Sequence, residues 1–129
     1  MSKLIEFVDR RISPLTTLNV FKSETPVKAV KLIACLSTQH QDQLSLRLVS
    51  ETGTEYWYPA KAFSLRLENP NVKIFIYNES QNIYGFTLDL FPRMLYGLDV
   101  VNGSGEAHII YYLALLVEEE TLSKEPNKI

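Results

Sequence analysis

The sequence predicts a mostly β protein: an antiparallel meander of about six or seven strands, closed as a small barrel or sandwich, with an N-terminal helix. Three observations lead to this fold class. From Val27 onward, short segments alternate apolar and polar residues, as strands with one buried face do. Clusters of turn-forming residues separate these segments. The loops span about four to six residues, whereas a parallel crossover needs a dozen or more, so successive strands should be antiparallel neighbours.

The N-terminal segment "SKLIEFVDRRI" is expected to form the helix. Its apolar residues recur with the spacing of one helical face: Leu4, Ile5, Val8 and Ile12. Ser2 is a suitable N-cap, and Pro14 ends the helix because the residue before a proline avoids helical geometry. The linker as far as Pro26 leaves room for a short strand.

The central segments predict strands joined by turns. "VKAVKLIACLS" is apolar and partly β-branched, as strands are, and the polar run "TQHQDQ" after it predicts a loop. "LSLRLVS" alternates strictly, with Leu44, Leu46 and Leu48 on one face, and "ETGTE" predicts a hairpin turn in which Gly53 is free to adopt a positive φ. The returning strand is "TEYWYPAKAF". Pro59 interrupts or bulges this strand, or places it at a sheet edge, because proline has no N–H to donate.

The second half continues with the alternating segments "AFSLRL", "VKIFIY" and "IYGFTLDL", and "NGSGE" is the strongest turn signal of the chain. "FPRMLYGL" fits either a helical turn starting at Pro92 or a strand. Residues 107–117 also fit a buried helix or a buried strand, and the start Ile-Ile-Tyr-Tyr favours a strand. The alternative fold is therefore α+β, with residues 91–98 and 107–117 as helices packed on an antiparallel sheet of about four or five strands.

Composition and length predict one globular domain over residues 1–117, followed by a flexible polar C-terminal tail over residues 118–129. The N-terminus lacks the apolar stretch of a signal peptide, and the longest apolar run, residues 109–117, is far shorter than the roughly 20 residues of a spanning helix. We expect a cytoplasmic protein with no membrane partner. The net charge of −2 combines a basic first part with an acidic last part, most simply a scatter of solvated charges.

Catalytic chemistry has little support in the sequence. The lone Cys35 sits in an apolar run, where a buried inert thiol is expected, and His40, Asp42 and His108 have no spacing that builds a catalytic or metal site with it. No phosphate-binding glycine motif is present. We expect no catalytic, metal or cofactor-binding residues, no cofactor and no enzymatic activity. Two carboxylates within strand-like segments are expected to face solvent, opposite the leucines and valine that flank them: Asp89 and Asp99.

The row Tyr56-Trp57-Tyr58 is the most informative stretch. In a strand the two tyrosines share one face and Trp57 takes the other, so the rings cannot form one platform. Counting from a turn centred on Gly53 places Leu48 opposite Tyr58 and Val49 opposite Trp57. On that register both tyrosines line the core.

Trp57 would then lie beside Arg47, with Lys73 and Phe75 on neighbouring strands, and these four are the candidate binding residues. Such a cluster fits the second core of a sandwich, a protein interface or a nucleic-acid surface.

These observations predict a non-enzymatic binding or assembly module that contacts another protein, or a second copy of itself, through an exposed aromatic sheet face or edge. The first alternative is single-stranded nucleic-acid binding by aromatic stacking with basic side chains, which the negative net charge makes less favourable. The second alternative is a barrel that binds a small apolar ligand.

Overall fold

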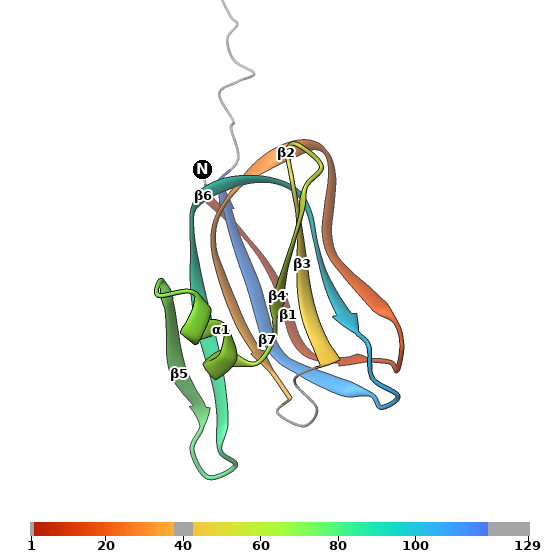
Figure 1. Cartoon of the computed structure of the whole chain (residues 1–129), viewed down its shortest axis with the longest axis vertical. Coiled ribbons are helices and arrows are strands. Elements are labelled where there is room, and N and C mark those ends of the chain that lie inside the picture. The colour runs from red at the N-terminus through yellow and green to blue at the C-terminus, as the bar shows by residue number, and fades with distance from the viewer. Residues whose placement is uncertain (1, 38–42, 119–129) are drawn as a thin grey trace, which may run out of the picture.

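The computed structural model describes residues 2–37 and 43–118, which form a seven-stranded antiparallel sheet with one short helix (Figure 1). Its elements in chain order are β1 (Ser2–Ile12), β2 (Thr17–Leu36), β3 (Leu44–Ser50), β4 (Glu55–Pro59), α1 (Ala62–Glu68), β5 (Val72–Asn78), β6 (Ile83–Asn102) and β7 (His108–Glu118). The mostly β, antiparallel prediction is confirmed. The segments 91–98 and 107–117 lie in strands, so the α+β alternative is wrong.

The strand order is β1-β7-β2-β6-β3-β4, and β5 pairs with β6 beside this path. β2 and β6 are each 20 residues long and arch over one end of the molecule (Figure 1). The first half of β6 pairs with β5 and the second half of β2, so that Leu88 lies opposite both Val72 and Leu32. The second half pairs with β3, where Val100 lies opposite Leu46. The sheet is not closed, so the predicted barrel is wrong. Its edges are β1, β4, β5 and the first half of β2, because β7 pairs only with residues 28–36 of β2.

The predicted N-terminal helix is absent, because residues 2–12 form strand β1 paired with β7. Along β1 the partly buried residues Ile5 and Phe7 pack against the core at odd positions, whereas Ile12 is buried at an even one. Between them Asp9 adopts a left-handed conformation, with φ of 49°. The residues of β1 that face the core therefore change from odd to even positions along the strand. This change of phase made the spacing of the apolar residues resemble that of a helix.

The predicted strand "AFSLRL" is instead the helix α1. Strand alternation would place Leu65 and Leu67 on the same face, but Leu65 is fully buried and Leu67 is 88% exposed. Leu65 shares the buried helical face with Ala62, three residues earlier. After Pro59 ends β4, the chain crosses from the β3 side of the sheet to β5 on the other half of β6, and α1 occupies this crossing (Figure 1).

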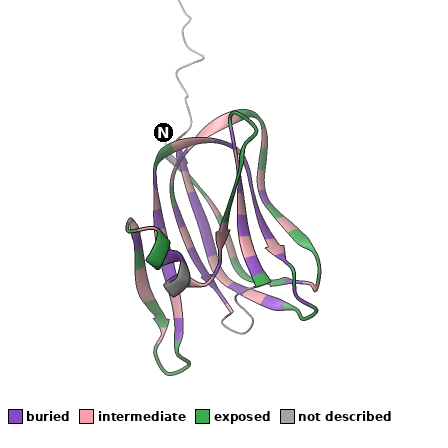
Figure 2. Cartoon of the chain, in the orientation of Figure 1, coloured by how far each residue is buried: buried purple, intermediate pink, exposed green. Residues whose placement is uncertain are grey.

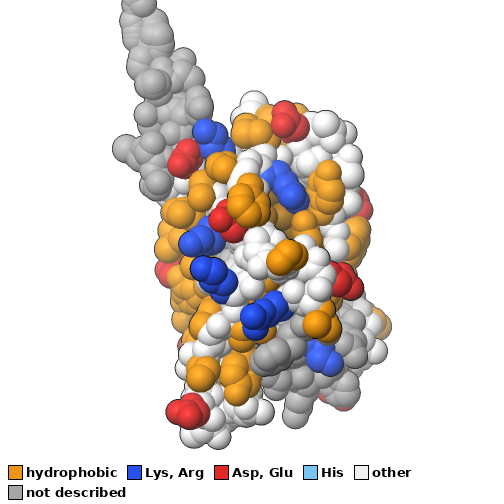
Figure 3. Space-filling view, turned by 60° about the vertical axis from the view of Figure 1, so that its left-hand side comes forward, with side chains coloured by type: hydrophobic (Ala, Val, Ile, Leu, Met, Phe, Trp, Pro, Cys, Tyr) orange, Lys and Arg blue, Asp and Glu red, His pale blue; other side chains and the backbone are white. Residues whose placement is uncertain are grey.

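One hydrophobic core lies inside the bent sheet, lined by inward residues from both halves (Figure 2). Its fully buried leucines include Leu32 of β2, Leu46 of β3, Leu98 of β6 and Leu113 of β7. The outer surface mixes hydrophobic side chains with Lys and Arg on the side that carries β5 and α1 (Figure 3). No helix within the described part of the chain is long and apolar enough to cross a membrane.

Candidate functional site

The hairpin of β3 and β4 places the aromatic row at a sheet edge. Arg47 lies directly opposite Trp57, Leu46 opposite Tyr58 and Leu48 opposite Tyr56. The predicted register is wrong by two residues, because the hairpin is centred on Thr52 and not on Gly53. A shift of two leaves every side chain on its expected face, so the prediction that Trp57 lies beside Arg47 and away from the leucines is confirmed.

Trp57 is exposed on the outer face but held in place by its neighbours. Half of its surface is accessible, which is incompatible with the core interpretation. Its indole Nε1 donates a hydrogen bond to Oε1 of Glu55 at 3.2 Å. The guanidinium carbon of Arg47 lies 5.4 Å from the centre of the indole, within the range of a cation–π interaction.

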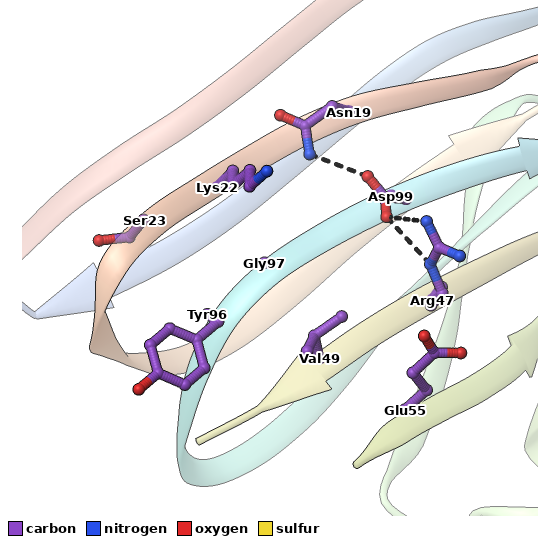
Figure 4. Close-up of a pocket in the computed structure, with 9 residues that line it drawn as sticks. All are labelled: Asn19, Lys22, Ser23, Arg47, Val49, Glu55, Tyr96, Gly97 and Asp99. Carbon is purple, nitrogen blue, oxygen red and sulfur yellow. Dashed lines mark hydrogen bonds and ion pairs between the residues drawn. The ribbon is translucent and has the colours of Figure 1, made fainter. Parts of the chain in front are cut away.

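Arg47 is in turn anchored by a buried carboxylate. Its Nε and Nη2 donate to Oδ2 of Asp99 at 3.0 and 2.5 Å, and the amide of Asn19 donates to the other carboxylate oxygen at 2.9 Å. The hydrogen bonding that Arg47 donates to Asp99 is the main cause that raises the pKa of Arg47 above its usual value, so the guanidinium keeps its charge. Asn19, Asp99 and Arg47 thus form a row across β2, β6 and β3 (Figure 4). The row ends at Trp57 of β4, against which the guanidinium of Arg47 lies.

Asp99 was expected to face solvent. It does lie on the face opposite Leu98 and Val100, both fully buried, but Asp99 itself is only 8% exposed. Arg47 and Asn19 satisfy its charge and its hydrogen-bonding capacity. The sequence contained no signal for this group, because nothing in it placed residues 19, 47 and 99 on adjacent strands.

A hollow of about 710 Å³ lies beside this row of residues (Figure 4). It forms where β2 bulges away from β6. Lys22 lies opposite Gly97 and Val27 lies opposite Leu95, so the four residues 23–26 of β2 are matched by the single residue Tyr96 of β6. Gly97 allows the two backbones to meet here, since a Cβ at this position would lie 3.1 Å from the carbonyl oxygen of Phe21. The lining combines the charged side chains of Lys22, Arg47, Glu55 and Asp99 with apolar atoms.

The other face of β4 carries a second pair of an arginine and an aromatic ring, which the sequence interpretation missed. The guanidinium carbon of Arg93, on β6, lies 4.9 Å from the ring centre of Tyr56. Its Nη1 donates to the hydroxyl oxygen of Tyr58 at 3.1 Å. Tyr58 packs against the core as predicted, whereas Tyr56 is 39% exposed. The edge strand β4 therefore has an arginine against a ring on each of its faces.

Lys73 and Phe75 do not join this cluster. They lie on β5, opposite Thr87 and Gly85 in the first half of β6, whereas β3 pairs with its second half. The sequence interpretation assumed that consecutive strands are neighbours, and the crossing through α1 breaks that rule. Of the four predicted binding residues, the structure brings together Arg47 and Trp57 only.

Of the residues considered for catalysis, the structure describes Cys35 and His108. Cys35 is buried, its thiol lies 3.6 Å from the carbonyl oxygen of Tyr84, and burial raises its pKa to about 11. His40 and Asp42 lie outside the described residues. Among the described residues, no cluster of three or more His, Cys, Asp or Glu side chains is arranged to hold a metal ion.

His108 is buried between two serine hydroxyls, 2.9 Å from Oγ of Ser37 and 3.1 Å from Oγ of Ser104. Ser104 donates its own proton to the carbonyl of Glu106 and so accepts from Nε2–H. Nδ1 is then the acceptor for the hydroxyl of Ser37. Ser37 also receives the backbone N–H of Ile109, so this network joins the end of β2 to the start of β7.

The fold and the site define an open, antiparallel β-sheet protein whose edge strand β4 presents aromatic rings fixed by arginines. Comparisons with protein-family models, with curated protein sequences and with solved structures found no match. The functional argument therefore depends on the geometry of this edge.

Proposed function

We propose that the protein is a non-enzymatic binding module that binds another polypeptide through the β4 surface, defined by Arg47, Tyr56, Trp57 and Arg93. The observation that supports this most is a half-exposed Trp57 held by Glu55 and Arg47. Trp, Tyr and Arg are the residue types that dominate the binding energy of protein interfaces. A side chain already fixed in the free protein loses less conformational entropy on binding, so its contacts contribute more to affinity.

The position of the surface at a sheet edge indicates how a partner would bind. Within the described chain, β4 pairs with β3 on one side and with no strand on the other. An extended segment added along β4 would form backbone hydrogen bonds there. It would meet Trp57 with one face and Tyr56 with the other, since these neighbours point to opposite sides.

The structure gives less support to the two alternatives. A stacking surface for single-stranded nucleic acid needs rings and free cations on one face. Here Arg47 is paired with Asp99, and Lys73 and Phe75 lie on another part of the sheet. The apolar-ligand alternative required a closed barrel, and the sheet is open.

The test is a selection of extended peptides from a random library on the folded protein. Binding of labelled peptides is then measured by fluorescence anisotropy. Trp57→Ala should weaken binding about tenfold or more, a loss of at least about 1.4 kcal/mol, because truncation removes the anchor of the interface. Tyr77→Ala is the matched control, since Tyr77 is also a partly exposed aromatic residue on an edge strand, β5, and should leave the affinity unchanged.

A second variant tests the role of the fixed indole. Asp99→Ala removes the anchor of Arg47 without touching a residue of the β4 surface, and should weaken peptide binding less than Trp57→Ala does. Peptides that bind the Trp57→Ala variant as tightly as the wild type would contradict the proposal. So would saturable binding of a single-stranded oligonucleotide that weakens steeply with salt, which would assign this surface to nucleic acid instead.

A further inference from the structure

The two arginines of the β4 surface differ in one respect, because only Arg47 has a counter-ion within the described part of the chain. Arg47 donates two hydrogen bonds to the carboxylate of Asp99. Arg93 contacts the ring of Tyr56 but forms no ion pair with any carboxylate that the structure describes. A charge that is withdrawn from water is stable only when an opposite charge or hydrogen bonds replace its hydration. The guanidinium of Arg93 is therefore a place where a bound partner can supply the opposite charge.

Arg93 is partly buried, unlike a freely solvated surface arginine. It lies directly opposite Ala29 of β2, which is fully buried, and directly opposite residues share a face of the sheet. Its side chain therefore starts on the face that carries the core. Arg93 also precedes Leu95, where the pairing of β6 with β3 begins. The guanidinium thus reaches the rings of β4 beyond the paired part of β3, at the rim of the core, where Tyr56 is 39% exposed.

Most of the hydrogen-bonding capacity of Arg93 is unused in the described chain. A guanidinium group has several N–H donors, and Arg93 forms one hydrogen bond, from Nη1 to the hydroxyl oxygen of Tyr58 at 3.1 Å. Glu51 is close in the fold, because its backbone N–H donates to the carbonyl oxygen of Met94, yet its exposed carboxylate forms no ion pair with Arg93. A carboxylate matches the remaining donors, because it can accept bidentate hydrogen bonds from a guanidinium.

We propose that the segment bound along β4 carries an aspartate or glutamate on the face that meets Tyr56, and that this carboxylate pairs with Arg93. The inference rests on the proposed function, in which an added strand meets Trp57 with one face and Tyr56 with the other. Side chains of a strand alternate between its faces, so the acidic residue is adjacent in sequence to a residue on the Trp57 face. The partner is therefore an extended segment whose acidic and apolar residues lie on opposite faces.

The Trp57 face should not share this preference. On that face the charge of Arg47 is already neutralised by Asp99. The carboxylate of Glu55 lies beside the indole and accepts its hydrogen bond. A further carboxylate at this face would meet Glu55, and like charges on facing strands destabilise their pairing. The preference for an acidic residue is therefore confined to the face that meets Tyr56.

A pair of labelled peptides measures this preference by fluorescence anisotropy. One is a peptide selected on the folded protein that contains a glutamate next to an apolar residue, and the other carries glutamine in place of that glutamate. The wild type should bind the glutamate peptide about tenfold more tightly, as expected for one charge-assisted hydrogen-bonded pair. Arg93→Gln should reduce this ratio to about one. Lys73→Gln removes an exposed cation from the edge strand β5 and is the matched control, which should leave the ratio unchanged.

Charge reversal separates ion pairing from a general loss of structure. Arg93→Glu should invert the preference, so that a peptide with lysine in place of the glutamate binds more tightly than the glutamate peptide. A variant that has lost its fold would bind neither peptide, so it cannot produce this inversion. Moving the glutamate by one position along the peptide places it on the Trp57 face and should abolish its advantage on the wild type.

Failure of this inference is distinguishable from failure of the proposed function. Peptides that require Trp57 but bind equally well with glutamate and with glutamine would overturn the acidic preference and leave the proposed function standing. The same holds for Trp57-dependent peptides that contain no acidic residue, and for a preference that Arg93→Gln leaves intact. If no selected peptide requires Trp57, the proposed function fails and the inference fails with it.

Discussion

At the scale of single residues, Asp99 determines how the outer face of β3 and β4 is organised. Its carboxylate is buried and accepts hydrogen bonds from the side chains of Arg47 and Asn19. A buried carboxylate is stable only when it is paired and hydrogen-bonded, and here both conditions hold. The consequence is an arginine that is fixed and still able to contact the ring of Trp57.

Cys35 gives the residue-scale prediction, which concerns pH. Burial raises the pKa of its thiol to about 11, from an ordinary value of 9.0. Since the thiolate is the reactive form, the native protein should react very slowly with a disulfide reagent such as DTNB at about pH 8, and rapidly once denatured. Fast labelling of the native protein would contradict the burial of this side chain.

The same shift predicts a loss of stability in alkali. Between pH 9 and 11 the thiol ionises in the unfolded chain but not in the folded one. The unfolded state then binds fewer protons, so the free energy of unfolding falls as pH rises through this window. Below pH 9 the protonated thiol makes its full contribution to the free energy of unfolding. Cys35→Ala lacks the thiol and is the control. Its unfolding free energy should fall less steeply over the same range when both proteins are denatured with urea.

At this scale the sequence predicts the face on which a side chain lies, because strand alternation alone determines that face. Arg47 and Trp57 were placed on one face because each strand alternates regardless of its exact register. Asp99, Asn19 and Arg93 were missed because their roles depend on which strands are neighbours. That neighbour relation comes from the crossover through α1 and from the long strands β2 and β6, neither of which is encoded in a local pattern.

At the scale of elements, Gly85 shows how β2, β5 and β6 fit together. Its φ is not in the left-handed region, so the requirement for glycine is steric. A Cβ at this position would lie 2.8 Å from the carbonyl oxygen of Ala34 in β2 and would also meet the ring of Phe75 in β5. The backbone of β6 therefore passes close to β2 beneath the Phe75 side chain.

Gly85→Ala should lower the free energy of unfolding by about 1–3 kcal/mol, because the strand or the ring must shift to admit the methyl group. Urea denaturation followed by circular dichroism measures this change. Gly105→Ala is the matched control, since a Cβ there would meet no atom within 4 Å, and its stability should be close to that of the wild type. Equal stabilities of the two variants would show that β5 does not pack over β6 as described.

Two elements could not be predicted from local sequence. In β1 the change of phase at Asp9 concealed the alternation of a strand. In α1 the leucines at positions 65 and 67 imitated that alternation, although a short helix buries only the first of them. Regular strands such as β3, whose burial alternates without interruption, were predicted correctly because one face is buried along its whole length.

At the scale of the whole molecule, the order of the strands joins distant parts of the chain. β1 pairs with β7, so that Ser2 lies opposite Glu118, and β2 pairs with β6, so that Thr17 lies opposite Val101. Only the pairs β3–β4 and β5–β6 are local hairpins. The central strands therefore cannot form until long loops of chain have closed, which costs conformational entropy before any contact compensates for it.

This topology predicts slow, cooperative folding. The refolding time should lie in the range of about milliseconds to seconds that is typical of β proteins dominated by distant pairings. The single Trp57 reports on the β3–β4 hairpin, and far-ultraviolet circular dichroism reports on the whole sheet. Because an isolated hairpin is at best marginally stable in water, Trp57 should reach its native fluorescence only together with the sheet. In stopped-flow refolding the two signals should share one rate. A tryptophan signal that is complete within the mixing time would instead show that the hairpin folds alone, and that the β4 surface does not depend on Asp99 and β6 for its rigidity.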